Sequence, residues 1–418
     1  MIESNATSFP SGSTMSKDSP HRLAEDMLVD FEKWLDMSQL QSYDSTDLWA
    51  SAYGAWAKGL YARNKSIGTV SVAPLLALDI VFPQARRFLA HRRSYPICHA
   101  HIGLAYLNLC SARHDDGYLG KAEGLVPGLL AMASPGTSGL GWGMKHDWMT
   151  VKGLIPRDTP CHTQTAYAFE FFSRLYDTTG KSEYQDFLAR IAHHEAHDFP
   201  EWTFGEKIVS SYSTRDDRKV VNANSYRMVM LLEAGHRFRR DDYLCKGMGA
   251  LHYVLSMQNP DGSWPYGEEE PFVDTYHTCF VLKNRLRARE HAGAKGPSVD
   301  HAIERGLRYY FTRLYDHEGF PIPFAVKPRM VPQRYDSYDL AESIGLLAGG
   351  GFDAARLLRL LRFARDEFQT PGGWFMFRRY PFLHIQGTPY LRYANSAMFL
   401  ALTKVLHRPR GTGQWSAG

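Results

Sequence analysis

The stretch AYAFEFFSRLYDTTGKSEYQDFLARIAHHEAHDF, residues 166–199, carries the pattern that decides the fold. Phe169, Phe172 and Tyr176 recur at helical spacing, so they fall on one helical face together with Leu175. A Thr-Thr-Gly break ends this helix, and a second amphipathic run begins after it. The stretch therefore predicts two helices joined by a short polar turn.

That hairpin recurs along the chain. The segments GLAYLNLCSARHDDGYLGKAEGLVPGLL (103–130) and MVMLLEAGHRFRRDDYLCKGMGALHYVLSMQ (228–258) repeat the order of helix, polar turn and second helix. In each copy a tyrosine opens the second helix, namely Tyr118, Tyr184 and Tyr243. These tyrosines lie 66 and 59 residues apart, which leaves room for two helices and a loop in each unit.

Repeated helical hairpins either close into a ring or stack into a rod. A linear α-solenoid usually has repeats of about 34–47 residues with short loops. Here the intervening segments are long and aromatic, as in residues 136–162, and such loops are uncommon unless they are functional. We therefore expect an all-α fold over residues 23–410, an (α/α) toroid with long aromatic loops at one end. The Ser/Thr/Pro-rich residues 1–22 and residues 411–418 are expected to be flexible tails.

The composition excludes several classes of protein. Of the 418 residues, 44% are hydrophobic and 13% aromatic, enough to fill a large core and to line a cleft for a flat ligand such as a sugar. The 48 basic and 44 acidic residues give a net charge of +4 without one long basic block, which argues against nucleic-acid binding. No run approaches the roughly 20 apolar residues that a membrane span requires.

Cysteine usage and the N-terminus bear on the compartment. Five cysteines are an odd number, and none forms a CxxC pair, so we expect reduced thiols in a cytoplasmic protein. The N-terminus lacks a basic segment followed by an apolar run, so it does not predict a secretion signal. The nearest metal motif, HHEAH at residues 193–197, departs from HExxH, and we expect no metal or other cofactor.

The first candidate site is QNPDGSWPYGEEEPFVDTYHT, residues 258–278, where polar groups alternate with aromatic rings. Its Pro-Asp-Gly turn stops one helix. Asp274, Tyr276 and His277 then precede an apolar helix, at the end where inner helices of a toroid face the cavity. These three residues are therefore candidate catalytic residues. The alternatives are that Asp274 is an ordinary helix N-cap and His277 a core histidine.

Two segments offer aromatic faces on which a sugar ring can stack. Trp264 and Tyr266 follow the Pro-Asp-Gly turn of the first segment. In GWGMKHDWMTVKGLIPRDTPCHTQ, Trp142 and Trp148 flank a charged stretch that includes Asp147. A loop this rich in Trp and Gly predicts a substrate platform, with a packed Ω-loop as the alternative.

The segment SSYSTRDDRKVVNANSYR, residues 210–227, precedes another helix. Asn222 and Asn224 lie two residues apart, so they cannot both cap that helix equally well. We expect them to hold substrate hydroxyls or a carboxylate, with Tyr212 as a proton-transfer group. Turn formation plus capping is the simpler interpretation.

Charged side chains precede the last two predicted inner helices. Asp336 and Asp339 are paired carboxylates of the kind that glycoside hydrolysis uses, although acids at helix starts also complement the helix dipole. Further along, Arg378, Tyr390 and Arg392 combine arginine with aromatic rings, which suits a carboxylated sugar or a phosphate. A surface cation–π pair is the alternative for this last group.

Several of these motifs together resemble a known family. QNPDGSWPYGEEEPFVDTYHTCFVL, VVNANSYRMVMLL and YLRYANSAMFLAL are similar to bacterial α/α-toroid proteins of the six-hairpin, glycosidase-like superfamily, over roughly residues 90–405. Such proteins are associated with surface-polysaccharide biosynthesis, so the resemblance implies a polysaccharide or oligosaccharide substrate. Two positions depart from the family pattern: Tyr338 stands where relatives have His, and Glu342 where they have Gln. The resemblance therefore leaves the reaction itself open.

The motif QNPDGSW is also similar to the repeat of terpene cyclases and prenyltransferases, which are α/α toroids as well. The chain contains no DxDD motif, which a proton-initiated cyclase would need. The zinc ligands that a prenyltransferase would need are not evident either. This second resemblance therefore supports the toroid more than it supports isoprenoid chemistry.

We expect a carbohydrate-active enzyme with one of two mechanisms. In the first, Tyr212 or Tyr276 and His277 act as acid and base beside a uronic-acid carboxylate bound by Arg392, giving epimerisation or lyase elimination. In the second, Asp274 and one of the two later aspartates hydrolyse a glycosidic bond. The alternatives are an isoprenoid-handling toroid and a non-catalytic glycan-binding protein.

Overall fold

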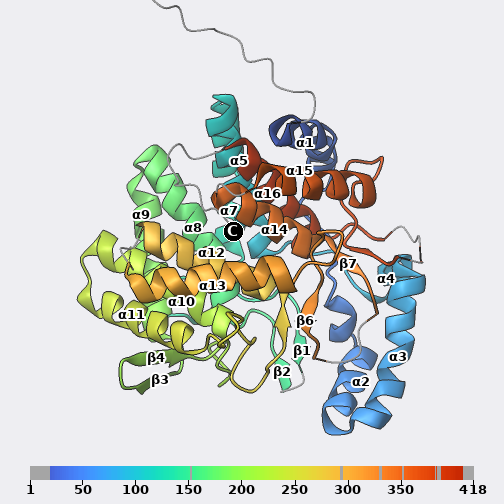
Figure 1. Cartoon of the computed structure of the whole chain (residues 1–418), viewed down its shortest axis with the longest axis horizontal. Helices are drawn as coiled ribbons and strands as arrows, with labels where there is room; N and C mark the ends of the chain where they lie inside the picture. Colours follow the sequence, from blue (N-terminus) through green and yellow to red (C-terminus); the bar gives the residue numbers. More distant parts are fainter. Residues whose placement is uncertain are drawn as a thin grey trace, which may run out of the picture.

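The structure is a computed structural model that describes residues 19–150, 153–291, 295–328, 332–350, 353–381, 383 and 387–407. Within these residues six helices form an inner ring (Figure 1): α5 (Pro96–Arg113), α8 (His162–Thr179), α10 (Val221–Phe238), α12 (Thr275–His291), α14 (Ser337–Gly350) and α16 (Ser396–Leu406). Each inner helix packs on the next along the chain, and α16 packs back on α5, so the ring is closed. The predicted (α/α) toroid is confirmed.

Outer helices cover this ring. Helix α1 packs on α16, α6 and α7 on α5, α9 on α8, α11 on α10, α13 on α12, and α15 on α14. Their bounds are α1 (Pro20–Met37), α6 (Gly117–Glu123), α7 (Val126–Ala131), α9 (Ser182–His197), α11 (Asp241–Ser256), α13 (Pro297–Arg313) and α15 (Ala354–Phe363). One continuous apolar core runs through both layers.

The burial pattern explains which helix lies in which layer. Inner helix α8 buries side chains on nearly all sides, including Phe169, Phe171 and Phe172, because it packs on neighbours in the ring and on α9 outside it. Outer helix α15 buries only a narrow stripe of leucines. Helix α8 ends where the sequence predicts, at Gly180, whose φ of 68° is the left-handed conformation that glycine adopts without a Cβ clash.

Short antiparallel strand pairs lie in the loops of the toroid, and four of them fall within the described ranges. They are β1 (Trp148–Thr150) with β2 (Gly153–Ile155), β3 (Glu201–Phe204) with β4 (Lys207–Ser210), β5 (Val273–Asp274) with β6 (Phe324–Val326), and β7 (Tyr335–Asp336) with β8 (Arg378–Arg379). Strands β5 and β7 run directly into α12 and α14. These pairs fix the backbone just before the inner helices, where the candidate residues lie.

The sequence did not predict a peripheral unit between α1 and α5. It contains the short helix η1 (Asp47–Ala50), the hairpin of α2 (Ala52–Arg63) and α3 (Lys65–Val81), then η2 (Pro83–Ala85) and α4 (Arg86–Leu89). Figure 1 shows α2 and α3 side by side at the edge of the molecule. Among the described helices, none alone is long and apolar enough to cross a membrane. Helix α3 and the segment Pro83–Leu89 together have sufficient length and apolar composition, but they form a pair bent by 107°.

The first helix begins slightly before the expected boundary of the N-terminal tail. Helix α1 begins at Pro20, so it already includes the last residues of the expected tail 1–22. The expected tail 411–418 lies outside the described residues. All five cysteines are free thiols, and Cys98, Cys161 and Cys279 are buried.

Candidate active site

The first turns of neighbouring inner helices meet at one end of the ring. The ring centroid of Tyr276, in the first turn of α12, lies 5.2 Å from that of Tyr338, in the first turn of α14. Tyr338 in turn lies 5.0 Å from Tyr393, in the short helix η4 (Leu391–Asn395) that leads into α16. Residues far apart in the sequence thus form one aromatic cluster at the N-terminal ends of the inner helices.

Asp274 and His277 form a carboxylate–imidazole pair within this cluster. The backbone N–H of His277 donates to Asp274 Oδ1 at 3.1 Å, and His277 Nδ1 lies 2.7 Å from Asp274 Oδ2. An ionised carboxylate only accepts hydrogen bonds, so Nδ1 carries the proton in this pair. Asp274 therefore both caps the start of α12 and fixes the imidazole tautomer, which combines the two interpretations of this residue. Within the described residues no hydrogen bond engages His277 Nε2.

Aromatic rings surround the imidazole of His277. Its centroid lies 4.1 Å from the ring of Tyr276 and 4.6 Å from that of Tyr266, with Phe272 and Phe280 at 6.3 and 5.9 Å. The His277 side chain is 18% exposed, whereas the Asp274 side chain is 1% exposed. The arrangement is a base held by a buried carboxylate, with its ring reaching solvent between aromatic walls.

The tyrosines of the site stay protonated. Burial raises the pKa of Tyr212, Tyr276 and Tyr338 well above the ordinary value, and neighbouring acidic groups add to the shift. A phenol with a raised pKa donates hydrogen bonds at neutral pH and is a poor base. Of the predicted acid–base partners, His277 therefore fits the base and the tyrosines fit the donors.

The pKa values of the two carboxyls at the start of α14, Asp336 and Asp339, are shifted in opposite directions. Burial alone would raise the pKa of Asp336, but Arg334 and Arg378 outweigh it and lower that pKa; Arg378 Nε donates to Asp336 Oδ1 at 2.6 Å. For Asp339, burial first and then the charges of Asp336 and Asp274 raise the pKa well above the ordinary value. Its Oδ1 is buried and has no hydrogen-bond partner in the described part of the chain. The pKa values of these two neighbouring carboxyls are therefore shifted in opposite directions, that of Asp339 upward and that of Asp336 downward.

Arg392 is engaged in a buried ion pair. Its Nη2 donates to Asp44 Oδ1 at 2.8 Å, and its guanidinium lies 3.8 Å from the centre of the Tyr393 ring. Burial alone would raise the pKa of Asp44, but Arg392 outweighs it and lowers the pKa. The expected role of Arg392 as a carboxylate clamp does not fit this geometry, because Asp44 already occupies the guanidinium. Tyr390 is also buried, with the Arg86 guanidinium 5.2 Å from its ring, so it offers no open face.

Arg218 is the cation beside the partly exposed aromatic rings, and the sequence did not single it out. Its guanidinium lies 4.6 Å from the centroid of Tyr212 and 5.6 Å from that of Trp148, and its Nη2 donates to Asp216 Oδ2 at 2.7 Å. The Tyr212 hydroxyl lies 3.2 Å from Thr163 Oγ1 in the first turn of α8. The sequence signal that could have identified Arg218 is its position in a long loop, between aromatic residues and an inner helix.

Some predicted binding residues have structural positions instead. Trp142 and Trp264 are buried and donate their indole N–H groups, each at 2.9 Å, to backbone carbonyls of α7 and α11. Asn224 is fully buried and uses its side-chain amide to hold the backbone of β4. Asn222 is buried, and its Oδ1 has no hydrogen-bond partner within the described ranges. Asp147 is exposed, and its Oδ1 accepts a hydrogen bond from the backbone N–H of Arg157. Trp142, Trp264 and Asn224 are therefore core or bracing residues, since burial leaves them no face for a ligand.

The two positions that depart from the family pattern have different surroundings. Tyr338 is part of the aromatic cluster beside Tyr276. Glu342, one turn further along α14, forms a buried ion pair with Lys283 of α12 inside the ring. Glu342 therefore braces two inner helices, whereas Tyr338 stands beside the candidate base.

A second histidine network is fully buried. His162 Nδ1 lies 2.6 Å from Glu195 Oε2, and His162 Nε2 lies 2.7 Å from Ser210 Oγ. The order of carboxylate, imidazole and hydroxyl resembles a nucleophile triad, but His162, Glu195 and Ser210 each have 0% exposure, so no substrate reaches the hydroxyl. This network ties α8, α9 and β4 together. Across the described residues, no group of three or more His, Cys, Asp or Glu is arranged to hold a metal ion.

Comparison with solved structures finds proteins of the same fold. A cellobiose 2-epimerase from Bacillus thermoamylovorans B4167 superposes with a TM-score of 0.60 over 91% of this chain and 99% of its own, at 10% identity. An unsaturated glucuronyl hydrolase specific for heparin gives a TM-score of 0.57 over 93% and 97%, at 10% identity. A polysaccharide lyase gives 0.52 over 75% and 90%, at 12% identity. At these identities the likeness shows the fold alone, an (α/α) toroid.

Comparisons of sequence add no closer relative. No family model matches the chain, and no curated protein matches it either. The activity therefore has to be argued from the site.

Proposed function

We propose that this chain is a carbohydrate-active enzyme that transfers a proton at a carbon atom of an oligosaccharide or polysaccharide, as an epimerase or a lyase does. The observation that supports it is the Asp274–His277 pair between aromatic rings, in which no hydrogen bond of the described residues engages His277 Nε2. Similar folds include an epimerase, a polysaccharide lyase and a glucuronyl hydrolase. A place in surface-polysaccharide biosynthesis, which the family resemblance implies, is part of this proposal.

The proposed chemistry follows from the protonation states. His277 Nε2 removes a proton from a carbon next to a carbonyl or carboxylate, and the electron pair of the C–H bond moves onto that group's oxygen. The buried carboxylate of Asp274 stabilises the imidazolium that forms. The neutral phenols of Tyr276 and Tyr338 are available to donate hydrogen bonds to the anionic intermediate.

Two outcomes are open to that intermediate. Donation of a proton by a phenol of the site to the opposite face of the carbon gives the epimer, and His277 then loses its proton to solvent while the phenolate takes one up. Breaking the C–O bond on the next carbon instead expels the glycosidic oxygen, which takes a proton from a donor of the site, and leaves an unsaturated sugar. Arg218 lies beside Tyr212 and Trp148, but Asp216 already accepts hydrogen bonds from its guanidinium, as Asp44 does from Arg392, so neither arginine is assigned as a clamp for a substrate carboxylate.

Hydrolysis is the second candidate function, favoured by Asp339. Burial and the neighbouring carboxylates raise its pKa, and a carboxylic acid with a raised pKa is the kind of group that protonates the leaving oxygen in glycoside hydrolysis. Its partner would be Asp274, because Asp336 is held by two arginines. An isoprenoid site would need apolar walls without paired polar groups, and a glycan scaffold needs no proton-transfer pair, so the Asp274–His277 pair favours neither.

The test compares the wild type with His277→Asn on cellobiose and on oligosaccharides that contain uronic acids. Epimers are detected by NMR, unsaturated products by their ultraviolet absorbance, and shortened chains by chromatography. We expect an epimer or an unsaturated product from the wild type and a loss of about 10²–10⁴-fold in His277→Asn, the usual contribution of a general base. His252→Asn, a partly exposed histidine of α11, is the matched control.

Wild-type turnover that survives in a folded His277→Asn variant would exclude His277 as the base. Chain shortening that depends on Asp339 but not on His277 would establish the hydrolase instead. Binding without any product from any of these sugars would favour a non-catalytic role.

A further inference from the structure

The hairpin of α2 and α3 buries mostly small residues between its helices and exposes large apolar ones, unlike a hairpin in a protein core. The buried residues of α2 are Gly54 and Ala57, and those of α3 are the small residues Gly68 and Ser71 together with the larger Leu75. The two backbones approach so closely that a Cβ on Gly68 would come within 2.0 Å of the Cα of Tyr61. Small residues inside and large apolar residues outside are typical of helix pairs whose surroundings are lipid.

Large apolar side chains of this region point outward. Those that are more than a third exposed are Tyr53, Trp56, Ile67, Val70, Leu76, Val81, Phe82, Phe88 and Leu89. The exposed fraction reaches 74% for Val70 and 73% for Phe88. A concentration of this kind on a protein surface marks an interaction site.

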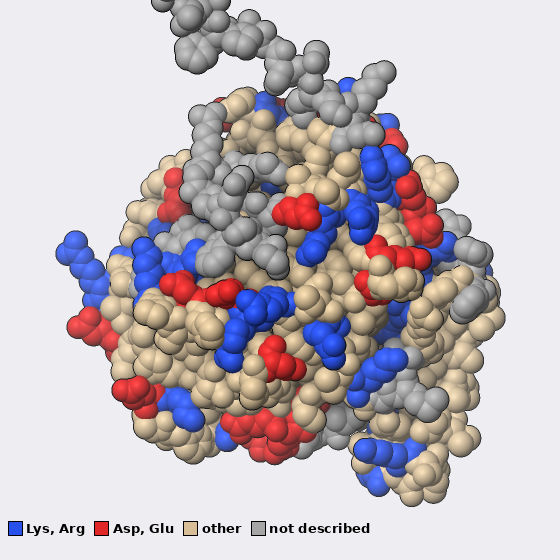
Figure 2. Space-filling view, viewed as in Figure 1, with Lys and Arg blue, Asp and Glu red and all other residues tan. Residues whose placement is uncertain are grey.

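The same segment is strongly basic. Residues 52–93 contain seven Lys and Arg and a single acid, Asp79, a net charge of +6, whereas the whole chain carries +4. Asp79 is paired with Arg86, so no exposed carboxylate opposes the positive charge. In Figure 2 the lower right of the molecule, where Figure 1 places α2 and α3, shows Lys and Arg among uncharged side chains.

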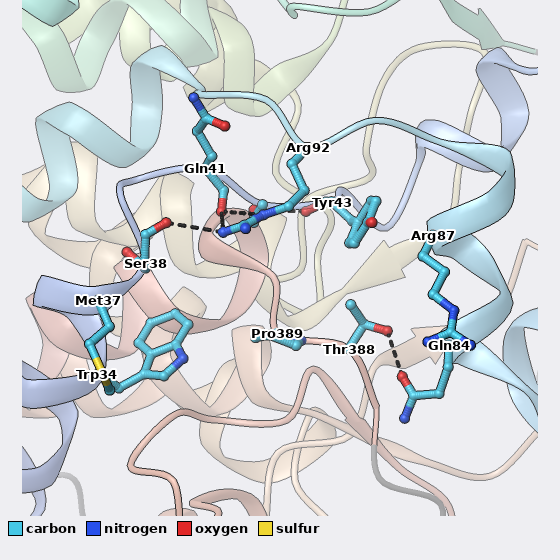
Figure 3. Close-up of a pocket in the computed structure, with 11 residues that line it drawn as sticks. Trp34, Met37, Ser38, Gln41, Tyr43, Gln84, Arg87, Arg92, Thr388 and Pro389 are labelled. Carbon is cyan, nitrogen blue, oxygen red and sulfur yellow. Dashed lines mark hydrogen bonds between the residues drawn. The ribbon is translucent and has the colours of Figure 1, made fainter.

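The basic residues flank the apolar surface at both ends. Arg63 and Lys65 are exposed at the turn between α2 and α3, and Arg87 and Arg92 are exposed at and beyond α4. Arg87 and Arg92 also line a pocket of about 480 Å³ between α1 and α4 (Figure 3), where Arg92 donates to the backbone carbonyl of Gln41 at 2.7 Å. The cationic surface thus continues from the hairpin into this pocket.

We propose that the segment α2–α4 docks on the surface of an anionic lipid bilayer. The apolar side chains enter the interface between headgroups and acyl chains, and the flanking Arg and Lys side chains bind the lipid phosphates. Helix α3 has 17 residues, shorter than the roughly 20 that a span requires, so the segment lies in one interface. A second copy of the chain fits less well, because two surfaces of the same charge repel each other.

The experiment is co-sedimentation of the full-length chain with vesicles. One set contains phosphatidylcholine alone, and in the other about a third of the lipid is phosphatidylglycerol, because the attraction depends on anionic lipid. We expect binding to the anionic vesicles that weakens as salt is raised, and little binding to the neutral ones.

Two variants separate the apolar and the charged contributions. The double variant Ile67→Ser with Val70→Ser should lose binding, whereas Phe204→Ser, which removes an equally exposed ring on β3, should retain it. Lys65→Gln and Arg87→Gln should each weaken binding about fivefold, the effect of one basic residue near an anionic surface. Circular dichroism checks that each variant is folded.

Equal binding to neutral and anionic vesicles, or none to either, would overturn the proposal. A concentration-dependent dimer in light scattering that Ile67→Ser with Val70→Ser abolishes would assign the surface to a second copy. Loss of binding in Phe204→Ser would show that adhesion is not specific to this segment.

Discussion

Replacing His101 by Asn should remove a pH-dependent part of the stability of the ring. His101 lies on α5 with 2% exposure, its Nδ1 3.2 Å from Ser396 Oγ of α16 and its ring 4.2 Å from that of Tyr167 of α8. It therefore stands where the ring closes. Burial, followed by the charges of Lys283 and Lys404, lowers the pKa of His101 to about 3.

The direction in which stability changes with pH follows from how many protons the folded and the unfolded chain bind. With a lowered folded-state pKa, the unfolded chain binds more protons than the folded one below about pH 6.5, so stability falls with the pH from there down to about pH 3. Between about pH 7.5 and about pH 5 the loss due to His101 alone is about 2 kcal/mol. Other groups titrate in this range as well, so the difference between variant and wild type is the quantity that isolates His101.

The assay is urea unfolding followed by circular dichroism at both pH values. His101→Asn is expected to be less stable than the wild type at neutral pH, because it leaves space in the core. Its deficit should shrink by about 2 kcal/mol at the lower pH, since the wild type alone then loses the His101 contribution. His317→Asn, whose side chain is 91% exposed, is the control. An equal pH dependence in His101→Asn and the wild type would refute the buried, neutral state of His101.

Three further predictions concern the candidate site and the core around it. Asp339→Asn should have a higher free energy of unfolding than the wild type near pH 8, and this advantage should disappear near pH 3. The reason is that the raised pKa of Asp339 lowers the stability of the folded wild type once the carboxyl of the unfolded chain ionises. A difference that stays constant with pH would contradict this. Asp274→Asn should lower kcat by about 10²-fold or more with little change in KM, because the imidazole loses its orientation; unchanged kcat would remove the pair from the mechanism. Trp142→Ala should lower the free energy of unfolding by about 3–5 kcal/mol in urea titrations, which is the usual effect of removing a buried aromatic ring from a core. A loss below about 1 kcal/mol together with weaker sugar binding would instead show that Trp142 binds the substrate.

The fold was predictable because local signals agree with one another. The Thr-Thr-Gly break marks the end of α8. The long aromatic segments argued for closure of the hairpins into a toroid. The hairpin of α2 and α3 was missed because its large apolar residues face outward. Its helices therefore lack the buried apolar face by which the repeated hairpins were recognised.

The site was predictable only in part. Asp274, Tyr276 and His277 lie within four residues at a helix start, so spacing alone brings them together. The partner of Arg392 is Asp44, which lies 348 residues away, and no local pattern shows that this guanidinium is already occupied. Trp142 and Trp264 looked like platforms because they stand in loops, but their indole N–H groups reach backbone carbonyls of the outer helices, a tertiary contact.

The central claim is that His277 Nε2 abstracts a proton bound to carbon, and solvent exchange measures this directly. The wild type and His277→Asn are incubated with the accepted sugar in deuterated water, and recovered sugar and product are analysed by NMR and mass spectrometry. The account predicts deuterium at one carbon with the wild type and none with His277→Asn. Turnover by the wild type that leaves every carbon-bound hydrogen unexchanged would contradict it.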